Sequence, residues 1–225
     1  MVLFISIDRY NIILITTWVV SQESDTRLMP KIVDHDLQRE AFAEAAMRLI
    51  ARNGLEGVTM RAVATESGLS YGSLFHYFDS KEQLLMHAVR TSIGQQTRRV
   101  NAYSSQYAGL EALEHLLCDD AVTSESSRDS MLVWMAFQYQ AALRESFAEM
   151  NAELVGGWQE RIRALLNDAK SAGEISRAID TDIEASALWA YSSGIGQLGV
   201  LHPDSFPPAR QQALIANYLD KLRAS

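Results

Sequence analysis

The stretch TMRAVATESGLSYGSLFHYFDSKEQ, residues 59–83, decides the fold of this chain. Its spacing of apolar residues predicts two short helices joined by a tight turn, with a third helix beginning directly behind them. Thr59 is a suitable N-cap for the first helix. Ser67-Gly68 is expected to end that helix, because glycine adopts the left-handed conformation without a steric penalty. This layout is typical of proteins that place one helix in the major groove of DNA.

The second helix of this unit is expected over residues 71–78, with Ser70 as its N-cap. Leu74 and Phe78 are four residues apart, so they share a face and should pack inward. The remaining side chains lie on the outer side of the helix, where they can reach base edges or phosphates. These outward residues are Tyr71, Gly72, Ser73, Phe75 and His76.

The third helix begins with Ser80-Lys81-Glu82-Gln83, a capping box with Ser80 as N-cap and Gln83 at the third position. Lys81 opposes the helix dipole there, which is understandable if a phosphate binds at this helix start. The alternative is an ordinary helical hairpin with aromatic residues in its core. The turn, the caps, the exposed aromatic row and the cation together favour DNA binding.

The segment from about Arg39 to Val89 resembles the N-terminal domain of TetR-family transcriptional regulators. The matching residues are AFAEAAMRLIARNGLEGVTMRAVATESGLSYGSLFHYFDSKEQLL, residues 41–85. The resemblance implies a first helix from Gln38 to Asn53 and a helix-turn-helix from Thr59 to Phe78. A fourth helix would then lead to a ligand-binding domain.

The same resemblance implies roles for individual residues. It implies contacts with the phosphate backbone from Thr59, Arg61, Tyr77 and Lys81. It assigns to the recognition helix Ser70, Tyr71, Gly72, Ser73, Phe75 and His76. Two positions depart from the family, since tyrosine is commoner at position 75 and lysine or arginine at position 71. Base preference therefore cannot be transferred from relatives.

The charge of the chain is unusual for a DNA-binding protein, because the net charge is −8. Residues 29–90 hold seven Lys and Arg against eight Asp and Glu, whereas residues 91–225 hold 11 against 17. The expected DNA-binding part is thus nearly neutral, which argues against loose, charge-driven binding to any DNA. It fits a dimer that presents a few placed cations, such as Arg52, Arg61 and Lys81, to two half-sites.

Composition predicts an all-α fold. The chain has 225 residues, 48% hydrophobic content and four prolines, and no segment alternates as a strand would. We expect a DNA-binding domain at residues 29–90 and a ligand-binding and dimerisation domain at residues 91–225. The single cysteine, Cys118, cannot form an intrachain disulfide, which fits a cytoplasmic protein.

The first 28 residues form a separate case, expected to be an N-terminal extension. Residues 1–20 are apolar, but Asp8, Arg9 and Asn11 interrupt them, so they match neither a membrane span nor a signal peptide. The leading interpretation is that translation starts at Met29 and that the preceding segment is not native. The alternatives are a sticky arm or a weak anchor.

The middle of the second domain is expected to hold a ligand. A polar loop at residues 119–129 should precede a helix at about residues 130–145, which is apolar almost all round and therefore central. The helix is either plain core or the wall of a cavity for a hydrophobic or aromatic effector. Its candidate pocket residues, with neighbours from the preceding segment, are Tyr103, Tyr107, His115, Trp134, Phe137, Gln138 and Tyr139.

Two later helices, at about residues 147–172 and 181–202, are expected to form an oligomer interface. The sequence LWAYSSGIGQLGVLHP, residues 188–203, resembles the BetI-type C-terminal domain of the TetR family. That resemblance implies a homodimer whose last two long helices form a four-helix bundle with their copies. The candidate interface residues are Met150, Leu154, Trp158, Ile162, Leu188, Tyr191, Ile195 and Leu198. A closing helix is expected at about residues 208–222.

Motifs for catalysis are scarce, so we expect no enzyme, no catalytic residue and no cofactor. His115, Cys118 and Asp119 could share a metal, but this small set lacks a second ligand cluster, and no metal site is expected. The predicted function is a ligand-responsive regulator that binds double-stranded operator DNA, most simply as a repressor, although activation is compatible with the sequence. The alternative is a small-molecule-binding helical protein or a helical enzyme without DNA recognition.

Overall fold

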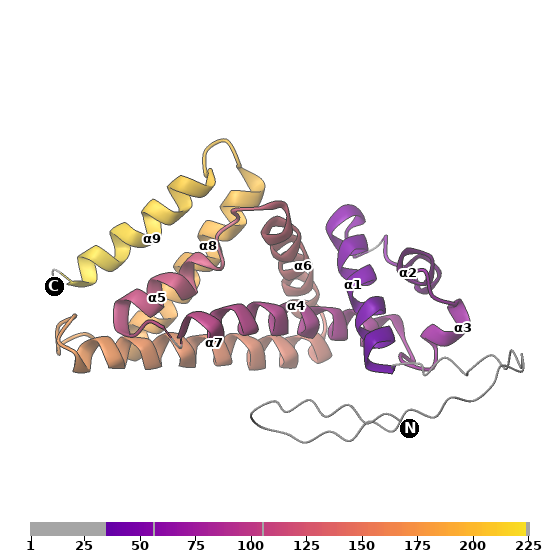
Figure 1. The fold of residues 1–225 in the computed structure, drawn as a ribbon, viewed down its shortest axis with the longest axis horizontal. Helices are drawn as coiled ribbons and strands as arrows, with labels where there is room; N and C mark the ends of the chain where they lie inside the picture. Colours follow the sequence, from indigo (N-terminus) through magenta and orange to yellow (C-terminus); the bar gives the residue numbers. More distant parts are fainter. Residues whose placement is uncertain (1–34, 56, 105, 224–225) are drawn as a thin grey trace, which may run out of the picture. The chain divides into compact units, whose positions relative to one another are not determined.

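In the computed structural model, the described residues are 35–223, without residues 56 and 105 and without the side chains of residues 102–104. These residues form nine helices and no strand, which confirms the all-α prediction (Figure 1). None of the described helices is long and apolar enough to cross a membrane. The expected N-terminal extension at residues 1–28 lies outside the described residues.

The first three helices form the helix-turn-helix unit. Helix α1 spans His35–Asn53 and α2 spans Met60–Ser67. Thr59 caps α2, because its Oγ1 accepts a hydrogen bond from the Ala62 N–H at 3.1 Å. Gly68 ends α2 with a φ of 71°, in the left-handed region that glycine tolerates. Both caps are as predicted.

Helix α3 is shorter than predicted, since it spans only Tyr71–Leu74. Ser70 caps it, as predicted, and accepts a hydrogen bond from the Ser73 N–H at 3.0 Å. The N–H groups of Tyr77 and Phe78 both bond to the Leu74 carbonyl at 3.1 Å, so the chain tightens into a turn after Leu74. Leu74 and Phe78 nevertheless point inward, and both are buried.

Helix α4 spans Lys81–Ser104 and begins with a modified capping box. The Ser80 Oγ accepts from the Gln83 N–H at 3.1 Å, as predicted. The Gln83 side chain, however, accepts from the Asp79 N–H at 3.1 Å, one residue before the N-cap of a standard box.

The remaining helices are α5 at Gly109–Cys118, α6 at Glu125–Ala141, α7 at Glu145–Ser171, α8 at Thr181–Leu201 and α9 at Pro208–Arg223. Helix α6 begins earlier than predicted because Ser124 and Ser127 form a reciprocal capping box. The loop before it is correspondingly short. Helix α8 is capped by Asp180, whose carboxylate accepts from two backbone N–H groups.

The described residues form two hydrophobic cores that do not divide at residue 90. The first core joins α1–α4 to the second half of α6 and the start of α7, through Val133, Phe137, Phe147 and Met150. The second core joins α5, the rest of α7, α8 and α9, with Val100 from α4. Helix α6 therefore packs directly on α1, and α4 runs from one core to the other (Figure 1).

The glycines of α8 lie on two different sides of the helix. A side chain at Gly196 would meet Met131 and the Asp120 carbonyl, and one at Gly199 would meet Gln211. These two glycines thus allow close packing inside the chain. At Gly194 an added Cβ would meet nothing within 4 Å, so this glycine opens toward the outside of the helix.

Candidate functional site

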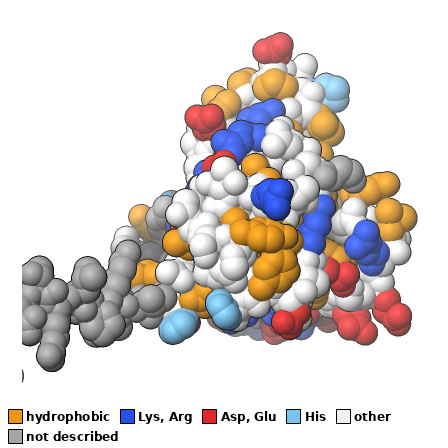
Figure 2. All heavy atoms as spheres, turned by 90° about the vertical axis from the view of Figure 1, so that its right-hand side faces the viewer, with side chains coloured by type: hydrophobic (Ala, Val, Ile, Leu, Met, Phe, Trp, Pro, Cys, Tyr) orange, Lys and Arg blue, Asp and Glu red, His pale blue; other side chains and the backbone are white. Residues whose placement is uncertain are grey.

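The outer face of the helix-turn-helix carries an aromatic pair. Tyr71 and Phe75 are 44% and 47% exposed, and their rings meet edge to face with centroids 5.1 Å apart. Gly72 and His76 beside them are also exposed. Figure 2 shows hydrophobic side chains gathered in the middle of the face that carries α2 and α3, with Lys and Arg side chains nearby. The outward placement predicted for these residues is confirmed, except that Ser73 is half-buried.

Two of the predicted phosphate-contacting residues lie next to this pair. Arg61, on α2, is exposed, and its guanidinium lies over the Tyr71 ring at 5.6 Å from the centroid. Thr59 is exposed two residues earlier, at the start of the same helix. The structure thus brings a cation, a helix N-terminus and the aromatic pair onto one surface, an arrangement that can bind a phosphate backbone and the adjacent bases.

The other two predicted contacts have partners inside the chain. The Tyr77 hydroxyl donates to Gln38 Oε1 at 2.9 Å and lies 2.8 Å from Nδ1 of His35. Lys81 Nζ donates to the Leu55 carbonyl at 2.9 Å, which ties the start of α4 to the loop after α1. An ammonium has three N–H groups, so Lys81 can keep this bond and still donate to a phosphate.

Replacing Lys81 with alanine is expected to weaken binding to every DNA sequence by a similar factor. The plot of log affinity against log salt should become shallower by about one charge. Fluorescence anisotropy over a salt series would measure both effects. The variant also loses the hydrogen bond to Leu55, which can lower its stability, so the measurement should be made well below its melting temperature. Arg177→Ala removes one charge from an exposed loop remote from α3 and is the matched control. An unchanged salt slope for Lys81→Ala would remove Lys81 from the phosphate contacts.

Arg52 is less available to DNA than the sequence suggested. Arg48 and Arg52, both on α1, pair with Glu66 on α2 at 2.9 and 2.5 Å. The hydrogen bonds from these two guanidinium groups lower the pKa of the Glu66 carboxyl. Glu66 therefore connects α1 to α2, and its charge offsets part of the charge of Arg52.

A cavity of about 70 Å³ lies where the two cores meet. Its wall includes Val89 and Val133, which belong to the first core. It also includes Trp158 and Trp189, which pack against the second core. Trp134 completes a set of three indole side chains from α6, α7 and α8. The cavity is therefore lined by residues of both cores.

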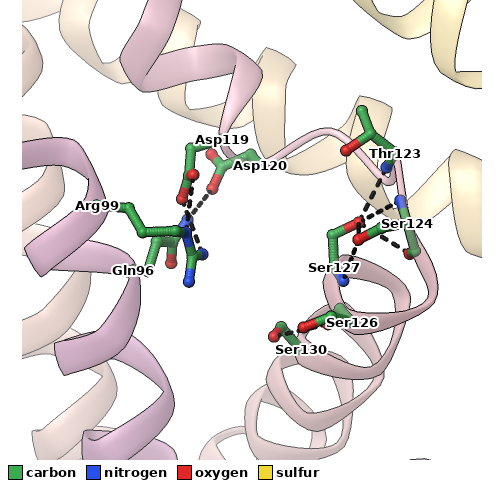
Figure 3. A network of polar contacts seen from close by, with 9 residues as sticks. All are labelled: Gln96, Arg99, Asp119, Asp120, Thr123, Ser124, Ser126, Ser127 and Ser130. Atoms are coloured by element: carbon green, nitrogen blue, oxygen red, sulfur yellow. Dashed lines mark hydrogen bonds and ion pairs between the residues drawn. The ribbon is translucent and has the colours of Figure 1, made fainter. Parts of the chain in front are cut away.

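Two carboxylates directly after α5, Asp119 and Asp120, line the same cavity. Figure 3 shows them beside Gln96 and Arg99. Asp119 pairs with Arg99 of α4, whose Nη2 lies 3.1 Å from its Oδ2. Asp120 accepts hydrogen bonds from Gln96 at 2.8 Å and from Ser192 at 3.0 Å. Among the described residues, no Lys or Arg forms an ion pair with Asp120. With both carboxylates ionised, the cavity wall therefore holds one negative charge more than it holds positive charges.

Burial raises the pKa of Asp120 to about 6, and the hydrogen bonds from Gln96 and Ser192 limit the rise. The nearby charge of Asp119 adds to the increase. A cation in the cavity would favour the ionised carboxylate and lower this pKa again. The site is thus suited to an organic cation, because indole faces also attract cations.

Most of the residues predicted to line a pocket lie elsewhere. Of the predicted residues that the structure describes, only Trp134 borders this cavity. Phe137 is buried in the first core, and Tyr139 is 61% exposed. The cavity wall does not include Gln138, Tyr107 or His115, and the last two stack on each other with centroids 4.2 Å apart. The Tyr103 side chain lies outside the described residues. The composition of α6 had suggested that this helix is buried all round. The exposed Tyr139 shows that it is not.

The described part of the chain contains no group of three or more His, Cys, Asp and Glu placed to hold a metal. Burial raises the pKa of the Cys118 thiol to about 11, with further increases from the charges of Glu114 and Asp120. The thiol therefore stays protonated at neutral pH and is a poor metal ligand.

The residues predicted for the dimer interface point mainly into the protomer. Met150, Ile162, Leu188 and Ile195 are buried there, so they cannot face a second copy. The other four predicted residues are half-buried in the same chain: Leu154, Trp158, Tyr191 and Leu198. The sequence analysis interpreted this apolar stripe as an oligomer interface, whereas its four buried members pack inside the same chain.

The capped helix-turn-helix with an exposed recognition helix, joined to a helical domain with an internal cavity, defines a ligand-responsive DNA-binding regulator. Residues 43–88 match the model of the tetR family of bacterial regulatory proteins. Residues 109–224, just over half of the chain, match the C-terminal domain of BetI-type transcriptional repressors. The chain belongs to the TetR family of transcriptional regulators, as its sequence had indicated.

Several known proteins are similar to this chain over most of their length. The HTH-type transcriptional regulator PksA of Bacillus subtilis is 28% identical over 86% of this chain and 94% of its own. The regulator BetI of Vibrio vulnificus is 26% identical over 86% of this chain and 96% of its own length. A regulator from Saccharomonospora viridis, solved in complex with choline, has a TM-score of 0.76 at 23% identity over 82% of this chain and 96% of its own.

The cavity residues that sequence reasoning missed include Asp120, Gln96, Arg99 and Trp189. One signal for the carboxylates was present in the sequence. Asp119 and Asp120 follow directly at the C-terminus of α5, where negative charge opposes the helix dipole. Such a position favours a functional explanation. Trp189 had no comparable signal, because it falls within an apolar helix.

Proposed function

We propose that this chain is a homodimeric repressor that leaves its operator when an organic cation enters the cavity between its two cores. The observation that carries the proposal is the half-buried Asp120, without a cationic partner among the described residues, in a cavity with three tryptophans. The effector class differs from the hydrophobic molecule expected from the sequence, because the wall contains a carboxylate that is not neutralised. Binding alone, in the cytoplasm and without a catalytic step, would perform this function.

The size of the cavity supports a small effector. A water molecule needs roughly 10–15 Å³ of such space, so about 70 Å³ suits a ligand of about five to seven heavy atoms. A quaternary ammonium head group has this size, and aromatic side chains are its usual partners. The choline complex of the Saccharomonospora viridis regulator supports the same class of ligand.

The two cores suggest how the signal would travel. A cation held by Trp158 and Trp189 on one side would press on Val89 and Val133 on the other. Val89 lies in α4 and Val133 in α6, and both helices pack on α1 of the DNA-binding part. Their movement would change the spacing of the two recognition helices from the roughly 34–36 Å that operator half-sites require. Since coupling is reciprocal, operator DNA should weaken effector binding by the same factor.

The outward face of α8 supports a dimer through this helix. Ile183 and Leu201 are 69% and 57% exposed. Between them, Ala187 and Ala190 are exposed and Gly194 opens outward. This stripe of apolar and small residues follows one face of the helix over five turns, so a second copy of α8 could pack closely against it.

The effector test uses choline and its neutral isostere, 3,3-dimethylbutan-1-ol, with the full chain on a labelled operator selected from random double-stranded DNA. Choline should release the DNA and change the tryptophan fluorescence, and it should act at concentrations about tenfold or more below those of the alcohol. Equal effects of the two compounds would contradict a cation site. A chain that selects no DNA sequence would contradict the operator-binding function itself.

A further inference from the structure

The recognition helix lacks the side chains that usually read purines. Residues 70–78 contain no Arg, Lys, Asn or Gln, the residues that make paired hydrogen bonds to guanine or adenine. The Ser73 hydroxyl already donates to the Ser70 carbonyl at 2.8 Å. On the outer face of this segment, the polar groups that remain include the Tyr71 hydroxyl and the His76 imidazole. Hydrogen bonding therefore accounts for only part of any sequence preference.

The largest exposed groups on this helix are the two aromatic rings. The edge-to-face contact between Tyr71 and Phe75 fixes the rings against each other, and Arg61 lies over the Tyr71 ring. An added Cβ at Gly72 would meet nothing within 4 Å, so no side chain obstructs approach to the pair from that position. The two rings form an apolar ridge, with the Arg61 cation on one side of it.

The major groove presents one apolar group to such a ridge, which is the C5-methyl of thymine. Nonspecific attraction to phosphates is weak here, since residues 29–90 hold seven cations against eight anions. Selectivity must then come from contacts at the bases. We propose that Tyr71 and Phe75 recognise thymine methyl groups in each operator half-site, an inference that rests on the DNA-binding function.

The test removes single methyl groups from the DNA. An operator is first selected by the full chain from random double-stranded DNA, and each thymidine is then replaced by deoxyuridine. At one or two positions per half-site, affinity should fall about fourfold per methyl, the factor expected for one buried methyl group. At those positions a C·G pair should bind more weakly than the same pair with 5-methylcytosine, because the latter restores the methyl.

Protein variants assign the effect to the ridge. In Phe75→Ala or Tyr71→Ala, the penalty for deoxyuridine should disappear at the thymine that the removed ring contacts. Leu143→Ala removes an exposed apolar side chain from the turn after α6, and it should retain the full penalty. Tight, selective binding that no deoxyuridine weakens would overturn the inference and leave the operator-binding function intact. A penalty that persists in both aromatic variants would also overturn it.

Discussion

A Gly194→Arg variant is expected to be monomeric and to bind its operator about 100-fold or more weakly than the unaltered chain. Gly194 lies midway along the exposed stripe of α8, and the space beyond its Cα is open. An arginine there fits the isolated protomer but puts a bulky charge where a second α8 would pack. The monomer loses the second half-site, which in the dimer binds at a high effective concentration.

Light scattering after size exclusion would give the oligomeric state, and anisotropy the DNA affinity. Gly157→Arg is the matched control, since Gly157 is an exposed glycine of α7 that also has open space around an added Cβ. It should remain dimeric and bind DNA normally. If Gly157→Arg but not Gly194→Arg dissociates the dimer, the interface lies on α7 and not on α8. A dimer that survives both changes would exclude both faces.

Asp120→Asn is expected to abolish release of the operator by choline while leaving the affinity for DNA within about twofold. Asparagine has the same size as aspartate. Its Oδ1 can accept from Gln96 and its Nδ2 can donate to the Ser192 hydroxyl oxygen, but it carries no charge to attract a cation. Asp204→Asn makes the same change in the exposed turn between α8 and α9, and the response to choline should persist there. Release of the operator from both variants at the same choline concentration would exclude Asp120 as the cation partner.

The same variant tests the burial of this carboxyl through pH. Asp120 has a pKa of about 6 in the fold, against an ordinary value of 3.8. The folded chain therefore binds a proton that the unfolded chain has already lost between about pH 4 and pH 6. Across that window, the contribution of Asp120 to the free energy of unfolding should fall by roughly 3 kcal/mol as the pH rises. Denaturant titrations should show this loss reduced in Asp120→Asn.

Effector binding should have the opposite pH dependence. A cation requires the ionised carboxylate, so the affinity for choline should increase as the pH rises through about 6 and become constant above it. Isothermal titration at several pH values would measure this directly. An affinity that does not change between pH 5 and pH 7 would contradict direct contact between the cation and Asp120.

Local chemistry made the DNA-binding part predictable from its sequence. Thr59, Gly68 and Ser70 act through their nearest neighbours in the chain, so their caps could be assigned correctly. The early end of α3 could not be predicted. There the Leu74 carbonyl accepts hydrogen bonds from two N–H groups, and no residue type in the sequence indicates this arrangement. The choice between continuing a helix and tightening it depends on how Phe78 packs in the folded core.

The cavity and the interface were harder to predict because they depend on which helices meet. Periodicity identified Met150 and Ile162 as members of an apolar stripe, but it could not say that the stripe faces the same chain. The outward stripe of α8 is made largely of alanine and glycine, so it carries little hydrophobic signal. In the same way, Asp120 and Trp189 are 69 positions apart, and only the fold brings both to one cavity.

The first four helices share a core with parts of α6 and α7. This core limits how the DNA-binding part could be exchanged between regulators. A hybrid regulator cut after Arg90 would separate Phe42 and its neighbours from Phe137 and Phe147, which complete the same core. Both fragments would expose apolar surface that a foreign partner is not shaped to cover. Engineers who wish to change the sensed compound should therefore redesign the cavity wall within the intact chain. Exchanging the DNA-binding half as an independent module would disrupt the fold.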